Sequence, residues 1–150
     1  MNQPILDFYE EYEFMSNFYD SPIIMPDGIT YPTGEHAFQA HKYMPTKYPD
    51  WLKKRMEMAA MKDPGTAKSY GQGVRLDEPA WFTVRWDVMY TVVKRKFEQN
   101  FLLQELLLQT GDVYIEEGNC WGDIIWGVCD GKGFNWLGKI LMQVRKELQQ

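Results

Sequence analysis

The sequence EEGNCWGDIIWGVCDGKGFNWLGK, residues 116–139, combines residue types that suit neither a plain core nor a disordered linker. It holds three of the six tryptophans, two asparagines, four carboxylates and several glycines. Tryptophan offers a flat stacking surface, and glycine allows sharp turns and close approach to a ligand. Two interpretations are open: a compact loop that forms part of a functional site, or a tight loop whose tryptophans cap a core.

The length and composition are those of an ordinary soluble globular protein. At 150 residues the chain can bury a substantial core, so we expect a single domain over residues 1–150. Apolar residues make up 45% and charged residues 25%, which is the usual balance. The formal net charge of −5 disfavours broad non-specific binding to nucleic acid, because that binding needs a basic surface. It leaves a nucleotide open as a small-molecule substrate.

Neither a metal site nor a membrane segment is expected. The two cysteines, Cys120 and Cys129, and the two histidines lack the CxxC or HxxxH spacing of zinc ligands. The chain does not start with a basic segment followed by an apolar run, and no stretch is long and apolar enough to span a membrane. We therefore expect a cytoplasmic protein without a membrane partner.

Helix signals outnumber strand signals along the chain. Thr33 and Asp63 are expected to cap the N-termini of the helices that follow them. Caps and apolar periodicity predict helices over residues 34–43, 51–62, 64–70, 80–99, 102–108 and 136–148. Pro-Asp-Gly at residues 26–28 predicts the turn of a hairpin. Extended segments are expected over residues 5–9, 12–19, 23–25, 29–31, 113–117 and 124–128.

The longest periodic segment covers residues 80–99 and predicts a central helix that is buried on several sides. Its main apolar stripe consists of Phe82, Trp86, Met89, Val93 and Phe97. Trp86 lies within this stripe and is expected in the core. Trp81, at the start of the helix, can equally line a cleft.

Glu35 lies in the first turn of the helix that follows Thr33, where backbone N–H groups favour an anion. An ionised carboxylate can act as a base or stabilise a cation, so Glu35 is a candidate catalytic group. The alternative is that Glu35 only caps the helix. Glu35, Gln39 and Lys42 share one helix face, and such a polar face is usually solvated.

Other polar positions also have a functional and a structural interpretation. Asn17 lies among aromatic residues and either lines a pocket or forms a turn. Lys68 can bind a phosphate or remain a solvated lysine. Gly131 and Gly133 precede the last helix, whose N-terminus can receive a phosphate, but their spacing is not the dinucleotide-binding fingerprint.

Several stretches, in their order and spacing, resemble the NADAR superfamily of YbiA-like N-glycosidases. They are FMSNFY at residues 14–19, PTGEHAFQAHK at 32–42, PGTAK at 64–68, Trp81 with Arg85, KF at 96–97, TGD at 110–112, Glu116, Asp123, WG at 126–127, GKG at 131–133, Asn135 and LG at 137–138. The resemblance runs from about residue 8 to about residue 148 and thus covers nearly the whole chain.

The resemblance implies a compact α+β fold, mostly helical, that forms a single domain with a few short strands. It also implies hydrolysis of the N-glycosidic bond between a ribose carbon and a base-like nitrogen. Substrates of the family include ribosylamino-pyrimidine phosphate intermediates of riboflavin biosynthesis and ADP-ribose adducts such as ADP-ribosylated guanine. The expected partner is a small nucleotide-like molecule, with nucleic acid only as an ADP-ribosylated substrate.

The resemblance also assigns residues to the site. It implies catalytic carboxylates at Glu35 and Asp123 and base-stacking rings at Trp81 and Trp126. We expect further substrate contacts from the polar residues Asn17, Lys68, Glu116 and Asn119.

In this scheme one carboxylate activates water or stabilises positive charge on the ribose, and the second orients the sugar hydroxyls. Neither a metal nor an organic cofactor is needed. The alternative is a non-catalytic module that senses NAD or ADP-ribose with the same tryptophans and glycines. A partner-binding protein without a small-molecule pocket is the third interpretation.

Overall fold

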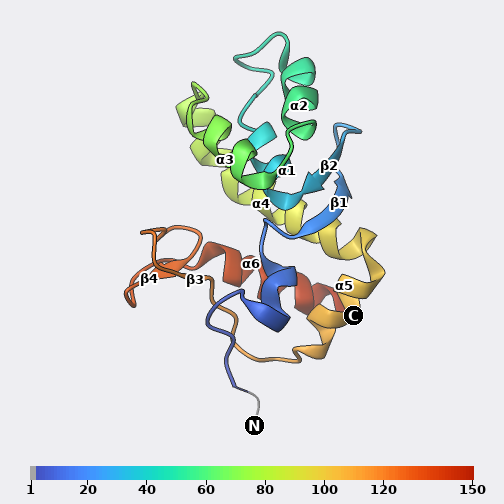
Figure 1. Ribbon diagram of the computed structural model, residues 1–150, viewed down its shortest axis with the longest axis vertical. Coiled ribbons are helices and arrows are strands. Elements are labelled where there is room, and N and C mark those ends of the chain that lie inside the picture. Colours follow the sequence, from blue (N-terminus) through green and yellow to red (C-terminus); the bar gives the residue numbers. More distant parts are fainter. Residues whose placement is uncertain (1–2) are drawn as a thin grey trace. The chain divides into compact units, whose positions relative to one another are not determined.

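The computed structural model describes residues 3–150 and divides into two compact units. One unit comprises Asn17–Gln99, and the other joins the segment up to Ser16 with Asn100–Gln150. Helices dominate both units and the strands are short, so the fold is α+β and mostly helical, as predicted (Figure 1). The single domain over residues 1–150 stays a prediction.

The unit of residues 17–99 begins with the predicted hairpin. Strand β1 (Asp20–Ile24) pairs antiparallel with β2 (Thr30–Thr33). Gly28 has a φ of 81° in the connecting turn, a conformation that glycine adopts without strain. The hairpin leads into the helices α1 (Gly34–Ala40), α2 (Trp51–Ala59), α3 (Pro64–Gln72) and α4 (Glu78–Gln99).

Side-chain caps explain where α1 and α3 begin. Thr33 Oγ1 accepts a hydrogen bond from the N–H of His36 at 3.2 Å, and Asp63 Oδ1 accepts one from the N–H of Thr66 at 2.6 Å. Both predicted N-caps are confirmed. Helices α1 and α2 end about one turn earlier than the sequence predicted.

The other unit is held together by pairing between its N-terminal segment and residues 114–118. Ile5 forms a parallel β-bridge with Ile115, and the N–H of Gly118 donates to the carbonyl of Leu6 at 3.0 Å. Its elements are the 3₁₀ helix η1 (Glu10–Met15), α5 (Phe101–Gln109), the parallel strands β3 (Gly118–Asn119) and β4 (Val128–Cys129), and α6 (Trp136–Leu148).

The extended segments predicted for this unit are wrong in extent. Residues 113–117 form only a β-bridge with Ile5. Residues 124–128 do not form a full strand, because side chains of the loop bind backbone groups that a sheet would need. Asn119 Nδ2 donates to the carbonyl of Asp123 at 2.8 Å, and Asp123 Oδ1 accepts from the N–H of Trp126 at 2.9 Å. Near the N-terminus, η1 replaces part of the predicted extended segment 12–19.

Helix α4 confirms the long helix predicted for residues 80–99. Met89 and Phe97 are buried, but Phe82 is 54% exposed and Trp86 is partly exposed, so the predicted core position of Trp86 is wrong. The reason is that β1 packs against the later turns of α4. Gln99, near the end of the helix, exchanges hydrogen bonds with the Ile24 backbone.

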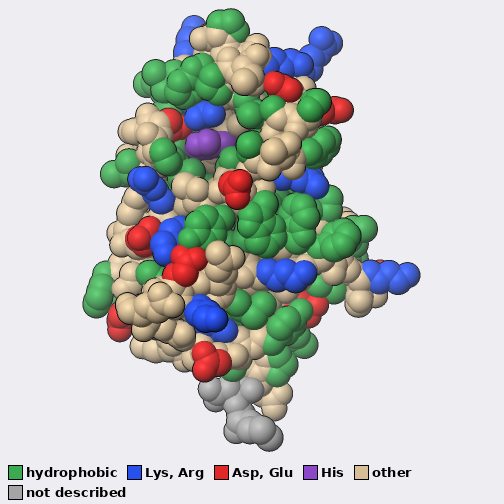
Figure 2. All heavy atoms as spheres, turned by 180° about the vertical axis from the view of Figure 1, so that it is seen from behind, with side chains coloured by type: hydrophobic (Ala, Val, Ile, Leu, Met, Phe, Trp, Pro, Cys, Tyr) green, Lys and Arg blue, Asp and Glu red, His purple; other side chains and the backbone are tan. Residues whose placement is uncertain are grey.

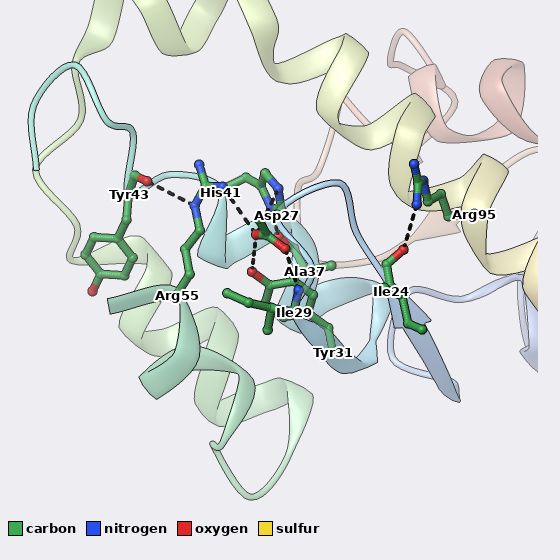
Figure 3. Close-up of polar contacts among 9 residues, drawn as sticks. All are labelled: Ile24, Asp27, Ile29, Tyr31, Ala37, His41, Tyr43, Arg55 and Arg95. Atoms are coloured by element: carbon green, nitrogen blue, oxygen red, sulfur yellow. Dashed lines mark hydrogen bonds and ion pairs between the residues drawn. The ribbon is translucent and has the colours of Figure 1, made fainter. Parts of the chain in front are cut away.

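A buried polar cluster centred on Asp27 ties the hairpin turn to α2 and the end of α1 (Figure 3). Asp27 Oδ2 accepts from Tyr31 Oη at 2.7 Å and from Arg55 Nη1 at 3.3 Å, and His41 Nε2 lies 3.7 Å away. Asp27 Oδ1 accepts from the N–H of Ile29 at 2.9 Å. The Asp27 side chain is 3% exposed and that of Arg55 is 9% exposed, so water barely screens this ion pair.

Two groups of this cluster, Tyr31 and His41, have shifted pKa values. Burial and the hydrogen bond to Asp27 raise the pKa of Tyr31, so its phenol remains a donor. Burial, together with the positive charge of Arg55, lowers the pKa of His41. His41 Nδ1 donates to the carbonyl of Ala37 at 2.6 Å, which anchors the neutral ring on α1.

Lys96, on α4, is a fully buried cation. Its side chain is among the largest with less than 2% exposure, and its Nζ lies 5.8 Å from the centre of the Tyr19 ring. Burial lowers the pKa of Lys96 to about 7. A lysine with that pKa weakens the folded state at neutral pH, because its charge must leave water.

Replacing Lys96 with methionine is expected to remove a pH dependence of stability. The free-energy cost of burying the charged Lys96 is largest below its folded-state pKa of about 7. This cost disappears above the unfolded-state pKa of 10.5, where the lysine is neutral in both states. Wild type should therefore gain about 3 kcal/mol relative to Lys96→Met between about pH 7 and about pH 9.5. Urea unfolding at both pH values measures this gain. Lys53→Met, at an exposed position of α2, is the control, and an equal pH response of the two variants would contradict the prediction.

The surface carries both signs of charge. On the face that Figure 2 shows, acidic and basic side chains are interspersed, and neither sign forms one continuous area. No helix within residues 3–150 combines the length and the apolarity that crossing a membrane requires.

Candidate active site

Glu35 lies in a buried polar group of the unit of residues 17–99. It is the second residue of α1 and is 8% exposed. Its Oε1 accepts a hydrogen bond from Gln39 Nε2 at 2.8 Å, one helical turn later. Its N–H donates to the carbonyl of Asn17 at 2.9 Å. Glu35 is therefore fixed at both its backbone and its side chain, as a catalytic carboxylate needs to be.

Two lysines belong to the same group. Burial lowers the pKa of Lys42, the negative charge of Glu35 opposes this shift, and the positive charge of Lys68 adds to it. Lys42 is therefore within electrostatic reach of both Glu35 and Lys68. The Lys42 Nζ also donates to the carbonyl of Gly71 at 3.2 Å. A carboxylate and a second lysine within electrostatic reach of Lys42 suit a substrate that carries both a phosphate and a developing positive charge.

Phe18 adds an aromatic surface beside Lys68. The ring is 44% exposed, and the Nζ of Lys68 lies 5.8 Å from its centre. This pairing combines a cation for a phosphate with a ring for a flat group. The binding role of Lys68 stays a prediction, and Phe18 is an additional candidate that sequence reasoning missed.

Every residue of α1 is buried, which corrects the solvated face expected for Glu35 and Gln39. In the sequence, the spacing of these two residues and Lys42 puts them on one helix face. That spacing is the sequence feature that indicates a cluster of polar side chains. Gln39 is 5% exposed, and its Oε1 is buried without a hydrogen-bond partner among residues 3–150. A buried amide oxygen of this kind can accept a hydrogen bond from a bound ligand.

Gly71 sets the position of Gln39. A Cβ at Gly71 of α3 would overlap the side-chain amide of Gln39, so only glycine leaves room for the observed conformation. The close contact of α1 with α3 thus holds the amide against Glu35.

Replacing Gly71 with alanine is expected to displace Gln39 from Glu35 and to lower stability by about 1–3 kcal/mol, because the new methyl group overpacks a buried contact. Any activity that depends on Glu35 should fall with it, since the carboxylate loses its buried donor. Thermal unfolding and a turnover assay measure the two effects. Gly65→Ala is the matched control on α3, since its Cβ would make an ordinary contact of 3.5 Å with Asp63. Equal behaviour of the two variants would refute this role of Gly71.

Asn17 is buried rather than open to a ligand. It is 8% exposed, and its Nδ2 lies 3.3 Å from the sulfur of Met89 on α4. A Cβ at Gly34 would lie 2.9 Å from the Asn17 Oδ1, so the amide packs closely on the first turn of α1. The geometry supports positioning of Glu35, while the predicted substrate contact of Asn17 stays a prediction.

Trp81 is also largely buried. Its side chain is 3% exposed, and its ring centre lies 5.2 Å from that of Phe38 with an interplanar angle of 53°. The ring thereby packs α4 against α1. Stacking of a base on Trp81 stays a prediction, and it requires a ring face that is covered in this structure.

The other unit contains a second polar group in the loop between β3 and β4. Asn119 organises this loop: its Oδ1 accepts from the N–H groups of Trp121 and Asp123 at 3.3 and 3.1 Å, and its Nδ2 donates to the carbonyl of Val128 at 3.2 Å. With these bonds made inside the loop, Asn119 supports the loop backbone. A direct substrate contact from Asn119 stays a prediction.

Asp123 presents one carboxylate oxygen to the backbone. Its Oδ1 accepts from the N–H of Ile125 at 3.1 Å and from that of Trp126 at 2.9 Å. The residue is partly exposed, so a ligand can reach it from solvent. The bonds on Oδ1 fix the carboxylate and leave Oδ2 for a hydroxyl group, the contact expected of a residue that orients a sugar.

Aromatic rings lie next to this carboxylate along the chain. Trp126 is partly exposed and meets Trp136 edge to face, with ring centres 5.5 Å apart and an angle of 82°. Phe134, 59% exposed, lies 6.2 Å from Trp136. The contact with Trp136 holds the Trp126 ring in place, and its stacking role stays a prediction.

Glu116 and the start of α6 serve the local fold. The N–H of Glu116 donates to the carbonyl of Ile5 at 2.8 Å, and its predicted substrate contact stays a prediction. The N–H groups of Trp136 and Leu137 donate to the carbonyls of Ile125 and Trp126 at 3.1 and 2.9 Å. These N–H groups are engaged, so the phosphate interpretation of this helix start is not supported.

Within the described part of the chain, no cluster of three or more His, Cys, Asp or Glu side chains is arranged to hold a metal ion. The binding roles of Lys68 and Trp126 for a nucleotide-like ligand stay predictions.

Comparison with known proteins gives a consistent match. The NADAR domain model matches residues 7–149. A riboflavin biosynthesis protein of Vibrio vulnificus is 38% identical over 158 residues, which cover 100% of this chain and 40% of that protein. The chain thus spans less than half of that relative. The N-glycosidase YbiA of Escherichia coli is 36% identical over 155 residues, covering 99% of this chain and 91% of that one.

The similarity extends to three dimensions. The solution structure of the Escherichia coli protein YbiA superposes with a TM-score of 0.82 at 35% identity, covering 99% of this chain and 87% of that chain. Matches of this length and identity, in sequence and in structure, establish membership: the chain belongs to the NADAR domain family.

Proposed function

We propose that this protein is an N-glycosidase that hydrolyses the bond between a ribose carbon and a base-like nitrogen in a small nucleotide-like metabolite. The observation that carries the proposal is the Glu35 carboxylate, which is buried, accepts a hydrogen bond from Gln39 and interacts electrostatically with Lys42. Relatives named N-glycosidase YbiA, of which this chain covers most of the length, support the reaction class.

The reaction breaks the C1′–N bond and forms a C1′–O bond to water, while the leaving nitrogen takes up a proton. Positive charge develops on the ribose, so an ionised carboxylate stabilises the transition state more than the ground state. We assign that role, or the activation of the water, to Glu35. Protein carboxylates can do this without a metal.

The remaining residues take binding roles in this proposal. Asp123 orients sugar hydroxyls through the oxygen that does not bind the loop backbone. Trp126 stacks the base, a contact worth about 1–3 kcal/mol. Lys68 binds a phosphate of the substrate. Asn17 and Asn119 hold the elements that carry the two carboxylates.

Ribosylamino-pyrimidine phosphates are the favoured substrate class, because relatives include proteins named for riboflavin biosynthesis. ADP-ribose adducts such as ADP-ribosylated guanine are the second class. A non-catalytic module that senses NAD or ADP-ribose is the alternative function, and it would lose only affinity when Glu35 is changed.

A product assay tests the proposal. Purified protein is incubated separately with a ribosylamino-pyrimidine phosphate and with ADP-ribosylated guanosine, and the released base and sugar are quantified by liquid chromatography. Release from one substrate supports the reaction and selects the class. If neither substrate releases a product and calorimetry shows binding of ADP-ribose, the sensing module is the function and the enzyme proposal is wrong.

A further inference from the structure

A pocket in the unit of residues 17–99 shares no lining residue with the Glu35 group. It has a volume of about 510 Å³ and lies between α2, α3 and the segments that follow α1 and α3. That volume is in the range of small-molecule sites. Its main lining side chains are Tyr43, Tyr48, Lys54, Ser69, Tyr70 and Arg75.

Aromatic rings and a cation form one side of this pocket. Tyr43 and Tyr48 meet edge to face with ring centres 5.2 Å apart. The Nζ of Lys54 lies 5.6 Å from the centre of the first ring and 5.8 Å from that of the second. The third tyrosine, Tyr70, is 60% exposed and so has ring surface available for stacking.

The rim of the pocket is fixed by hydrogen bonds between two loops. Tyr48 Oη donates to the carbonyl of Arg75 at 2.8 Å, and the Nζ of Lys47 donates to the carbonyl of Leu76 at 3.2 Å. Thr46 Oγ1 donates to Asp77 Oδ2 at 2.8 Å. These bonds hold the loops together before any ligand arrives, which lowers the entropy cost of binding.

The pocket favours an anion. Lys54 and Arg75 line it, and no carboxylate does. Lys54 pairs with Asp50 at 3.8 Å, and because the Asp50 side chain is 55% exposed, this solvated pair offsets little of the positive charge. The negative charges of Glu57 and Asp50 also act on Tyr43. The hydroxyl of Ser69, on an exposed residue, adds a donor for the same anion.

Helix α3 separates this pocket from the Glu35 group. Ala67 and Gly71 form the buried side of the helix, and Gly71 contacts Gln39. Ser69 lies opposite this side at helical spacing, Tyr70 is 60% exposed, and both residues line the pocket. A ligand in the pocket would therefore not occupy the position next to Glu35.

We propose that this pocket binds a mononucleotide: a planar heterocycle stacked on the tyrosines, with its phosphate held by Lys54, Arg75 and Ser69. Stacking does not discriminate between bases, because every base has a flat face. The two cations favour a ligand that carries a phosphate. The site is additional to the N-glycosidase site and does not depend on that activity.

Nuclear magnetic resonance titration of the full chain with AMP tests the proposal. AMP should shift the amide signals of residues 43–54 and 69–75 with saturation, at concentrations of about 1 mM or less. Adenosine and inorganic phosphate, titrated separately, should each bind about tenfold more weakly or worse, because each lacks one of the two contacts. The same titration on Glu35→Gln removes any contribution from turnover.

Matched variants locate the binding. Tyr70→Ala and Arg75→Ala change exposed side chains, so the fold should persist, and each should weaken AMP binding about tenfold. Tyr9→Ala, at an exposed tyrosine outside this unit, should leave it unchanged. Unaltered affinity in both pocket variants, or shifts confined to residues near Glu35, would overturn the proposal. Binding of a short single-stranded oligonucleotide without binding of AMP would also overturn it, in favour of a nucleic-acid ligand.

Discussion

Replacing Glu35 with glutamine is expected to lower kcat for N-glycoside hydrolysis by about 10³-fold while leaving KM and stability nearly unchanged. Glutamine has the shape of glutamate, and its carbonyl oxygen can still accept the hydrogen bond that Gln39 donates at 2.8 Å. What is lost is the negative charge that stabilises a positively charged ribose. Because the charge matters more in the transition state than in the ground state, the effect belongs in kcat.

Glu98→Gln, at an exposed position of α4, is the control and should retain wild-type kcat. Circular dichroism checks that both variants fold. A Glu35→Gln protein with near-normal turnover would remove Glu35 from the chemistry.

The same variant has a second readout that does not depend on activity. Since the charge of Glu35 raises the pKa of Lys42, removing it should lower that pKa further. Titration of the Lys42 side chain by nuclear magnetic resonance measures this shift. An unchanged pKa would show that the two groups do not interact.

Replacing Asp27 with alanine is expected to lower the free energy of unfolding by about 3–5 kcal/mol, because it leaves a buried guanidinium without its counter-ion. Arg55 would keep its hydrogen bond to the carbonyl of Tyr43 at 3.1 Å and its contact with the Trp51 ring at 4.6 Å, but neither supplies a negative charge. The phenol of Tyr31 would also lose the acceptor at 2.7 Å (Figure 3).

Urea unfolding of Asp27→Ala and of Asp50→Ala measures this cost. Asp50 pairs with Lys54 at 3.8 Å on the surface, so its loss should change stability by no more than about 0.5–1 kcal/mol. The two variants remove the same side chain from a buried and from an exposed ion pair. Losses of equal size would mean that burial does not strengthen the Asp27 cluster.

The hairpin and the helix starts were predictable because they depend on neighbours in the sequence. A cap such as Thr33 or Asp63 acts on an N–H group three residues away. The turn at Gly28 needs only a glycine in the right place. The motifs shared with the NADAR domain family likewise lie in the sequence, and they singled out Glu35 and Asp123 before any geometry was available.

The strands near the C-terminal loop and the core position of Trp86 were not predictable in this way. The apolar residues at 124–128 predict a strand, but in the structure Asn119 and Asp123 bind the backbone of this loop. Trp86 lies on an apolar stripe of α4, but β1 packs against the later turns of this helix and leaves Trp86 partly exposed. In both cases a distant or side-chain partner overrides the local pattern.

The sequence by itself determined the helical character of the chain, its caps and turn, its family and the identity of its two candidate carboxylates. Tertiary structure alone decided that the polar face of α1 is buried, that Gly71 confines Gln39 against Glu35, and that Lys96 loses its hydration. It also decided that three tyrosines and two cations from separate segments line one pocket. The reason is physical: caps and turns act over three or four residues, whereas desolvation and charge coupling depend on groups that only folding brings together.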